Sequence, residues 1–380
     1  MAVYHQMGHQ SDNLLDNENL NQYRGAILSP VNYEQVAVLA QILLSRDRQN
    51  FVTIFDPQLY VPTSDRGHLR DWPYFPSDVD SADLASNQWW QDLVAAIVDN
   101  VAPMQPTAIC SPAIIPRVFN DDYYSRLVAD GRELSRALIG KDIRPIQSAI
   151  VGLADLAVQD RALAVASILS QTDSDTIYLL LYGDTHPRNE FSDTEEIKGA
   201  IRLVSLLEEA GIRVTVGYCS SDILLWKAVG ASSCSTGKFF NLRRFSRARF
   251  EEPPQGGGQL PYWFEESLMA FLRESDLIRV KDVGMLSESS QRNPFSAEIL
   301  DQLRNEPGKP WLALGWRQFM WWFADIENRI SHGNLDADDL LRRAEQNWVR
   351  LDRRRVLMEE VRNDGSWLRP WRRALAEYNA

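Results

Sequence analysis

The sequence predicts an α/β protein built as a closed (β/α)8 barrel of the TIM type, followed by a C-terminal α-helical extension. Apolar runs of strand length alternate with helix-like stretches over most of the chain, which is typical of parallel sheets. One run, TIYLLLYGD at 176–184, is nearly continuously apolar, as expected for a parallel strand buried on both faces. Polar clusters follow the strands, and barrels carry their chemistry at those strand ends.

The length of the chain fits this architecture. Its 380 residues accommodate one barrel of roughly 250 residues and an extension of about 100. We predict a lead-in at 1–24, the barrel at 25–290 and the extension at 291–380. Beyond residue 290 the chain is rich in tryptophan, and its helical stretches have one charged and one apolar face.

The first half of the barrel contains four predicted strands, each followed by a helix. The segments ILSPV and ICSPA echo one another and indicate equivalent positions in one barrel. A polar excursion at 61–83 separates the second strand from its helix, and loops of this length are usually functional. The strands are predicted at 25–33, 51–60, 106–115 and 143–157, and the helices at 33–46, 87–100, 121–139 and 160–171.

The second half continues the alternation but weakens after residue 239. The eighth strand rests on a short apolar run, LIRVKDVG, near Leu277. Strands are predicted at 176–184, 212–222, 231–239 and 277–284, and helices at 194–211, 223–230 and 261–275.

Composition and charge indicate in which compartment the protein is located and which partners it binds. The net charge of -12 opposes nonspecific binding of nucleic acid or anionic lipid by the molecule as a whole. No apolar run approaches the ~18 residues of a membrane helix, and the N-terminal residues lack the pattern of a secretory signal. Three cysteines without a CxxC pair favour reduced thiols. We therefore predict a cytoplasmic protein with no membrane partner.

The sequence predicts no metal site and identifies no cofactor. His5 and His9 are spaced i, i+4 but lack the glutamate of HExxH, so we interpret them as a chance pair. The glycine run at 256–258 has neither the Walker nor the dinucleotide spacing, and we interpret it as a linker.

Polar and charged side chains gather at the predicted strand ends. Asp56, Asp155 and Asp184 follow apolar or aromatic residues, where burial and mutual repulsion can separate their pKa values into an acid and a base. The alternative is that each aspartate caps a turn or the following helix. The strand-end set comprises Asn32, Asp56, Gln58, Ser111, Asp155, Asp184, His186, Cys219, Asp222 and Lys238.

The loop YGDTHPRNE, at 182–190, combines a carboxylate, an imidazole and a guanidinium. We predict that Asp184 and His186 exchange a proton with the substrate and that Arg188 holds an anionic group. The alternative is an ordinary strand-to-helix loop, in which Asp193 caps the next helix.

The segment from Ser235 to Phe250 is basic and contains no acidic residue. Barrels often bind phosphate through the loops after the seventh and eighth strands, so we predict a substrate-binding role for it. Its interleaved phenylalanines are also suited to stacking bases beside arginines. The alternative is that the phenylalanines belong to the core and the arginines pair with nearby carboxylates. The cations are Lys238, Arg243, Arg244, Arg247 and Arg249, and we predict that Lys238, Arg243, Arg244 and Arg247 bind the substrate.

Three functional hypotheses follow. We favour a barrel enzyme, a hydrolase or transferase, that performs general acid–base chemistry on a phosphate-bearing substrate, either a nucleotide or nucleic acid. The second hypothesis is a glycoside hydrolase that uses a pair of aspartates. The third is a non-catalytic barrel subunit that binds nucleic acid, or a protein partner through the C-terminal helices. The aspartates considered for the second hypothesis are Asp56, Asp155, Asp184 and Asp222.

Overall fold

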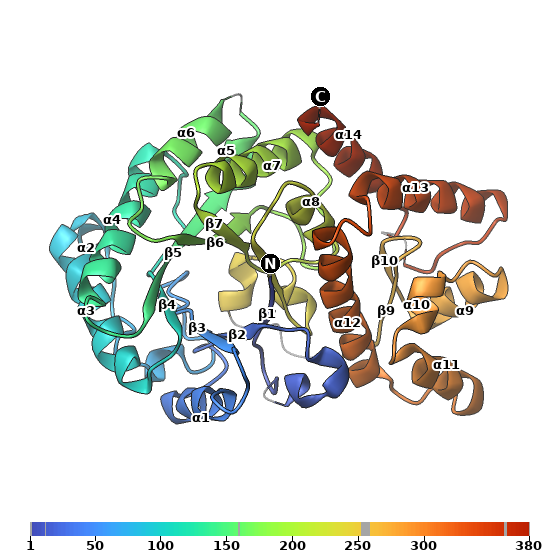
Figure 1. Cartoon of the computed structure of the whole chain (residues 1–380), viewed down its shortest axis with the longest axis horizontal. Helices are drawn as coiled ribbons and strands as arrows, with labels where there is room; N and C mark the ends of the chain where they lie inside the picture. Colours follow the sequence, from blue (N-terminus) through green and yellow to red (C-terminus); the bar gives the residue numbers. More distant parts are fainter. Residues whose placement is uncertain (1, 12, 159, 252–258, 361–362, 380) are drawn as a thin grey trace.

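The computed structural model describes residues 2–11, 13–158, 160–251, 259–360 and 363–379, so the glycine run at 256–258 lies outside the described residues. It confirms the predicted fold, because eight parallel strands form a closed barrel in sequence order (Figure 1). The strands are β1 (Ala2–Gln6), β2 (Gly25–Leu28), β3 (Val52–Phe55), β4 (Ala108–Cys110), β5 (Arg144–Gly152), β6 (Thr176–Tyr182), β7 (Arg213–Val216) and β8 (Ser233–Thr236).

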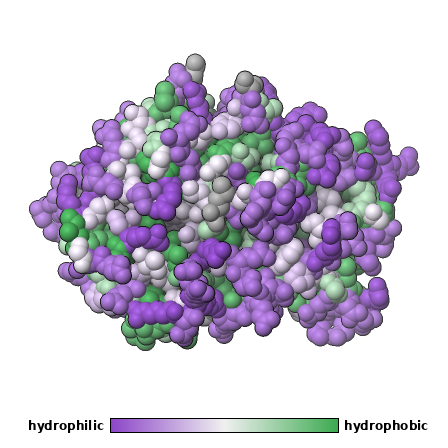
Figure 2. Space-filling model, in the orientation of Figure 1, coloured by the Kyte–Doolittle hydropathy of each residue, from purple (hydrophilic) through white to green (hydrophobic). Residues whose placement is uncertain are grey.

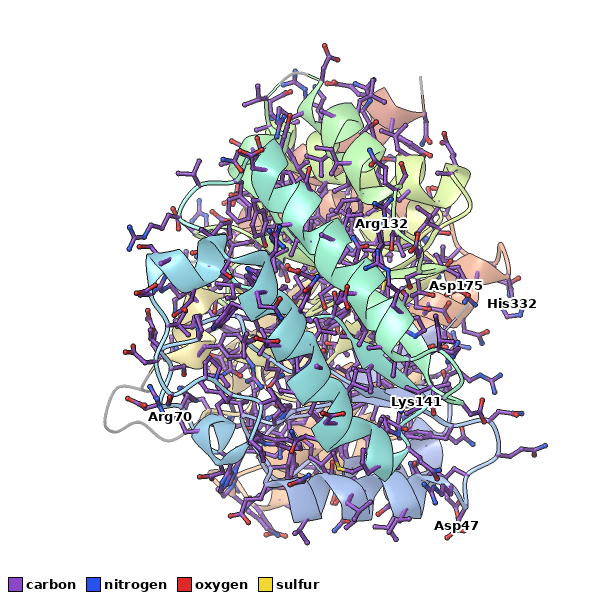
Figure 3. All side chains as sticks on the ribbon, turned by 90° about the vertical axis from the view of Figure 1, so that its left-hand side faces the viewer. Asp47, Arg70, Arg132, Lys141, Asp175 and His332 are labelled. Atoms are coloured by element: carbon purple, nitrogen blue, oxygen red, sulfur yellow. The ribbon has the colours of Figure 1, made fainter. Side chains whose placement is uncertain are left out.

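Helices cover the outside of this barrel. Several begin at a side chain that accepts hydrogen bonds from the first turn, as Ser86, Asn120 and Asp193 do. Figure 3 shows α3 and α4 side by side, with Arg132 of α4 on the outer surface. Figure 2 shows mainly hydrophilic side chains on one face of the molecule. The helices are α1 (Gln35–Ser45), α2 (Ser81–Ala85), α3 (Asn87–Val101), α4 (Asp121–Ala137), α5 (Leu153–Leu156), α6 (Arg161–Leu169), α7 (Thr194–Glu209) and α8 (Ile223–Ala228).

The first strand corrects the sequence prediction, because β1 lies within the predicted lead-in at 1–24. It pairs with both β2 and β8 and thereby closes the barrel. The strand has only five residues, and its Gln6 side chain is polar although buried. Gln6 accepts hydrogen bonds from Tyr178 (2.8 Å) and Ser235 (3.2 Å). This polar lining removes the apolar signature of a strand, and each later strand moves up by one position.

Two further predictions are wrong, both after β8. Residues 261–275, predicted as a helix, form an antiparallel hairpin of β9 (Trp263–Glu265) and β10 (Ala270–Leu272). Residues 277–284, predicted as the eighth strand, belong mostly to helix α9 (Glu274–Asp282). Leu277 and Val280 are buried three positions apart, which is helical spacing.

The predicted helical extension is present and is packed onto the barrel. Helix α12 lies beside β1 and α8 (Figure 1), over a β1–β2 connection whose described residues form only short 3-10 turns. The Tyr23 hydroxyl donates to the carbonyl of Met320 at 2.9 Å, and buried Lys227 pairs with Glu327 at 3.2 Å. The remaining helices are α10 (Glu288–Arg292), α11 (Ser296–Asn305), α12 (Leu312–Ser331), α13 (Ala337–Arg353) and α14 (Leu368–Tyr378).

Among the residues that the structure describes, none of the helices combines the length and hydropathy that crossing a bilayer requires.

Candidate functional site

Asp56 lies directly after β3, at the mouth of the barrel. Its side chain is buried, with the residue only 1% exposed. The Tyr60 hydroxyl donates to both carboxylate oxygens, at 2.8 Å and 2.9 Å, and the Gln58 backbone N–H donates to Oδ1 at 3.0 Å. Burial raises the pKa of Asp56 to about 6, and these hydrogen bonds and the charge of Arg249 oppose the rise only in part. The carboxyl therefore changes protonation state close to neutral pH, as a general acid or base does.

Arg249 brings a buried positive charge to this mouth. It lies in the basic segment after β8 and is 4% exposed. Its Nη2 is 3.5 Å from the Ser29 hydroxyl, at the outer limit of a hydrogen bond, and its Nε has no acceptor in the described part of the chain. No described carboxylate lies within 4 Å of its guanidinium. A buried cation without an ion-pair partner is unfavourable, so this one suits an anionic ligand.

Two residues at the mouth have strained backbones. Gln58 has φ 53° and Tyr218, shortly after β7, has φ 58°, both in the left-handed region that non-glycine residues rarely occupy. The Gln58 side-chain amide nitrogen and the Tyr218 hydroxyl are buried without a hydrogen-bond partner among the described atoms. Asp56 and Arg249 both influence the pKa of Tyr218, which burial raises. Strain and unsatisfied polar groups often coincide at functional sites.

Aromatic side chains from the basic segment cover the site. Phe245 and Phe250 pack against the Tyr60 ring, with centroids 5.0 Å and 5.1 Å away. The predicted excursion holds this cover in place, because Ser64 donates to the carbonyl of Phe250 and Arg66 donates to that of Glu251.

Three predicted substrate-binding cations are engaged within the protein. Lys238 donates to the carbonyl of Gln10 at 2.7 Å. Arg243 donates to the carbonyls of Gly237 and Lys238, both at 2.9 Å, and its guanidinium lies 3.8 Å from the centroid of the Phe319 ring. Burial lowers the pKa of Arg243 to about 9. Arg247 is exposed and pairs with Glu251 at 3.0 Å.

Arg244 is held between two buried carboxylates. It pairs with Asp222 and Glu190, both at 2.8 Å, and stacks on Phe191 at 3.6 Å. The loop at 182–190 and the basic segment therefore meet, through Glu190, which was not predicted, and the predicted Arg244. Burial raises the pKa of Glu190, against the charge of Arg244. With both terminal nitrogens on carboxylates, Arg244 is poorly placed to bind phosphate.

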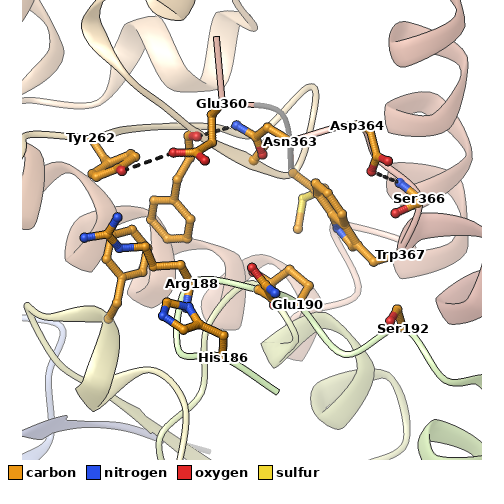
Figure 4. A pocket seen from close by; sticks show the side chains of 15 residues that line it. His186, Arg188, Glu190, Ser192, Tyr262, Glu360, Asn363, Asp364, Ser366 and Trp367 are labelled. Carbon is orange, nitrogen blue, oxygen red and sulfur yellow. Dashed lines mark hydrogen bonds between the residues drawn. The ribbon is translucent and has the colours of Figure 1, made fainter. Parts of the chain in front are cut away.

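The other predicted acid–base residues follow different strands, β5 and β6. Asp155 is in the short helix α5, where it pairs with Arg161 at 2.9 Å and accepts a hydrogen bond from Tyr124 at 2.8 Å. Asp184 and His186 are exposed in the loop after β6. His186 and Arg188 line a separate cleft of about 820 Å³ between this loop and the C-terminal extension. In Figure 4, Arg188 and His186 lie on one side of that cleft and Trp367 on the other.

One group of metal-ligating side chains occurs among the described residues, at Glu34, His68 and Asp71. His68 Nδ1 lies 2.9 Å from Asp71 and 3.6 Å from Glu34. Both carboxylates are more than half exposed, and exposed acidic groups of this kind are common without a metal ion.

Sequence reasoning found Asp56 but missed its partners. Tyr60 and Tyr218 were not among the predicted site residues, although each follows a strand within a few positions. Arg249 is one of five cations in the basic segment but was not among the predicted substrate-binding residues, whereas exposed Arg247 was, because nothing in the sequence distinguishes the two. A hydroxyl-bearing aromatic residue shortly after a strand is the signal that would have found the tyrosines.

Comparison with known proteins identifies no family. No protein-family model matches the chain. No curated protein matches its sequence.

Among solved structures, the chain is similar to an enolase from Bradyrhizobium complexed with magnesium and mandelic acid (TM-score 0.33, 10% identity, 62% of this chain and 52% of that chain). It thus spans about half the length of the enolase. It is also similar to a GH18 chitinase from Pseudoalteromonas aurantia (0.37, 10%, 63% and 95%). A third similarity is to the carboxyl transferase domain of Rhizobium etli pyruvate carboxylase (0.39, 9%, 86% and 61%). These values give no information on what this chain binds or catalyses.

Proposed function

We propose that this protein is an enzyme in which Asp56 performs general acid–base chemistry on a small phosphate-bearing substrate, and in which Arg249 holds the phosphate. The observation that carries the proposal is the buried guanidinium of Arg249, close enough to influence Asp56 and without a carboxylate partner among the described residues. An anionic ligand supplies the missing partner and removes the cost of an uncompensated buried charge.

Phosphate is the anion that the position of Arg249 favours. The residue belongs to the segment after β8, and barrels often bind phosphate in the loops after the seventh and eighth strands. A guanidinium binds phosphate through two parallel hydrogen bonds. The unsatisfied polar atoms of Gln58 and Tyr218 are available for other polar atoms of the substrate.

The chemistry follows from the environment of Asp56. With a pKa of about 6, the carboxyl is mainly ionised at pH 7 and can accept a proton from the substrate, and its protonated form can return one. Tyr60 fixes the orientation of the carboxylate through one hydrogen bond shared between the two carboxylate oxygens. In this proposal Asp56, one of the predicted catalytic residues, acts without Asp184 and His186, and Arg249 takes the role predicted for the engaged cations.

A thermal-shift experiment tests the anion site. Inorganic phosphate and small sugar phosphates should raise the melting temperature of the wild type, because ligands that bind only the native state stabilise it. The Arg249→Gln variant should lose this response, and Arg249→Lys should keep part of it. Arg247→Gln, which alters an exposed arginine in the same turn, is the matched control. Unchanged stabilisation of Arg249→Gln by phosphate would contradict the proposal.

Turnover of a stabilising phosphate ester, followed by phosphorus NMR, tests the catalytic role. Asp56→Asn should bind the ester and fail to convert it. Binding by the wild type without conversion of any ester would favour the non-catalytic subunit. Stabilisation by sugars that lack phosphate, and by no phosphate ester, would favour the glycoside hydrolase.

A further inference from the structure

The cleft beside the barrel mouth is formed by parts of the chain that the proposed function does not use. Its walls are the loop after β6, the β9–β10 hairpin and residues around Trp367. Its volume, about 820 Å³, lies within the range of small-molecule sites, roughly 300–1,000 Å³. We propose that this cleft is a separate binding site for a mononucleotide.

The first argument is the charge of Arg188. Its guanidinium lies 5.9 Å from the ring centroids of both Phe240 and Tyr262. No described carboxylate is within ion-pairing distance of it, whereas Glu360 across the cleft is already paired with Arg273 at 2.9 Å. Arg188 is therefore the cation in the cleft that can receive an anionic group, with the His186 imidazole beside it (Figure 4).

The second argument is the aromatic lining. The Phe240 and Tyr262 rings are half-buried, line the cleft and lie next to Arg188. On the opposite side, Trp367 is 6% exposed, and its indole N–H is buried without a hydrogen-bond acceptor among the described atoms. A nucleobase fits both features. Its flat face can stack on the aromatic rings, and the ring nitrogens or carbonyl oxygens at its edge can accept a hydrogen bond from the Trp367 indole N–H.

The third argument is the pair of carboxylates at the rim. Glu360 and Asp364 both line the cleft, Glu360 near Tyr262 and Asp364 beside Ser366 on the Trp367 side (Figure 4). Carboxylates commonly accept hydrogen bonds from ribose hydroxyls in nucleotide sites. The same carboxylates and the net charge of -12 oppose a longer polyanion, so one nucleotide is favoured over a nucleic acid strand.

Isothermal titration calorimetry with AMP, GMP, adenosine and inorganic phosphate tests the site. The wild type should bind a mononucleotide more tightly than either adenosine or phosphate alone. Arg188→Gln should weaken mononucleotide binding about tenfold or more, since a charge-assisted contact is lost, and should leave adenosine binding unchanged. Arg132→Gln, on the outer face of α4 (Figure 3), is the matched control and should bind as the wild type does.

A second variant addresses the base. Trp367→Phe keeps an aromatic ring and removes the indole N–H. It should therefore weaken the binding of AMP and of adenosine by the same factor and leave phosphate binding unchanged. Circular dichroism melts establish that each variant is folded.

Three outcomes would overturn the proposal. They are the absence of mononucleotide binding at millimolar concentration, phosphate that binds the Arg249→Gln variant as tightly as AMP does, and AMP binding that survives Arg188→Gln but disappears in Arg249→Gln. The last outcome would assign the nucleotide to the barrel mouth and support the proposed function. Loss of AMP binding in Arg188→Gln alone would support the cleft, whatever happens at Asp56.

Discussion

The Tyr60 hydroxyl donates a hydrogen bond to the carboxylate of Asp56, at 2.8 Å from Oδ1 and 2.9 Å from Oδ2. Both groups are buried, so this contact stabilises the ionised carboxyl where little solvent can do so. The balance between burial and this hydrogen bond leaves the pKa of Asp56 at about 6.

Removal of that donor should raise the pKa of Asp56 further. In Tyr60→Phe, the desolvation of the carboxylate remains and its strongest side-chain donor is gone. Carboxyl-carbon NMR of aspartate-labelled protein measures the change. Tyr74→Phe is the control, because the Tyr74 hydroxyl donates to the carbonyl of Pro57 instead. An unchanged or lower pKa in Tyr60→Phe would refute the role assigned to the hydroxyl.

The raised pKa of Asp56 predicts a stability that falls as the pH rises. The folded protein binds this proton more tightly than the unfolded chain, so the contribution is complete below pH 3.8 and is lost as the pH passes about 6. Between pH 4 and pH 8 the wild type should lose about 2.5 kcal/mol relative to Asp56→Asn. Urea denaturation of both proteins at the two pH values measures this difference, and a difference that is constant with pH would contradict the shift.

His5 on β1 should show the opposite dependence. Burial lowers the pKa of its imidazole to about 3, so the unfolded chain takes up a proton that the folded protein does not. Stability should therefore fall as the pH falls below 6.5, by about 2.5 kcal/mol between pH 7 and pH 4.5. His5→Phe keeps the ring next to Tyr23 and should abolish this loss in urea denaturation measurements. An equal acid sensitivity in the variant would show that other groups cause it.

Neighbouring arginines of the basic segment should differ strongly in their effect on stability. Arg244→Gln leaves Asp222 and Glu190 as buried carboxylates without their cation, and we expect it to lower the free energy of unfolding by about 3–5 kcal/mol. Arg247→Gln breaks an exposed pair with Glu251 and should cost less than about 1 kcal/mol. Chemical denaturation measures both values. Similar values would mean that the buried pairs do not hold the two loops together.

The fold was predictable because the central strands and the helices next to them have clear hydrophobic patterns. The β6 segment is apolar on both faces, and apolar residues recur at helical spacing in the helix that follows it. Strand β1 lacks such a pattern, since its buried Gln6 makes polar contacts inside the barrel. The β9–β10 hairpin was predicted as a helix and α9 as a strand, because the short apolar runs in these segments do not favour one periodicity over the other.

The candidate site was predictable only in part. The position of Asp56 after a strand was enough to select it. Sequence alone does not predict which carboxylate pairs with which arginine from a distant loop. The pairing of Arg244 with Glu190 and Asp222 could therefore not be predicted. Nor does it separate buried Arg249 from exposed Arg247 within one short turn. A partner surface on the C-terminal helices stays a prediction.

The closure of the barrel by β1 has a consequence for biosynthesis. On the ribosome β1 emerges early, but its second neighbour β8 and its covering helix α12 follow only after most of the other strands. During synthesis one edge of β1 is therefore open to wrong pairing, and the barrel cannot close co-translationally until late. The nascent chain should depend more on chaperones than refolding experiments with the complete chain suggest.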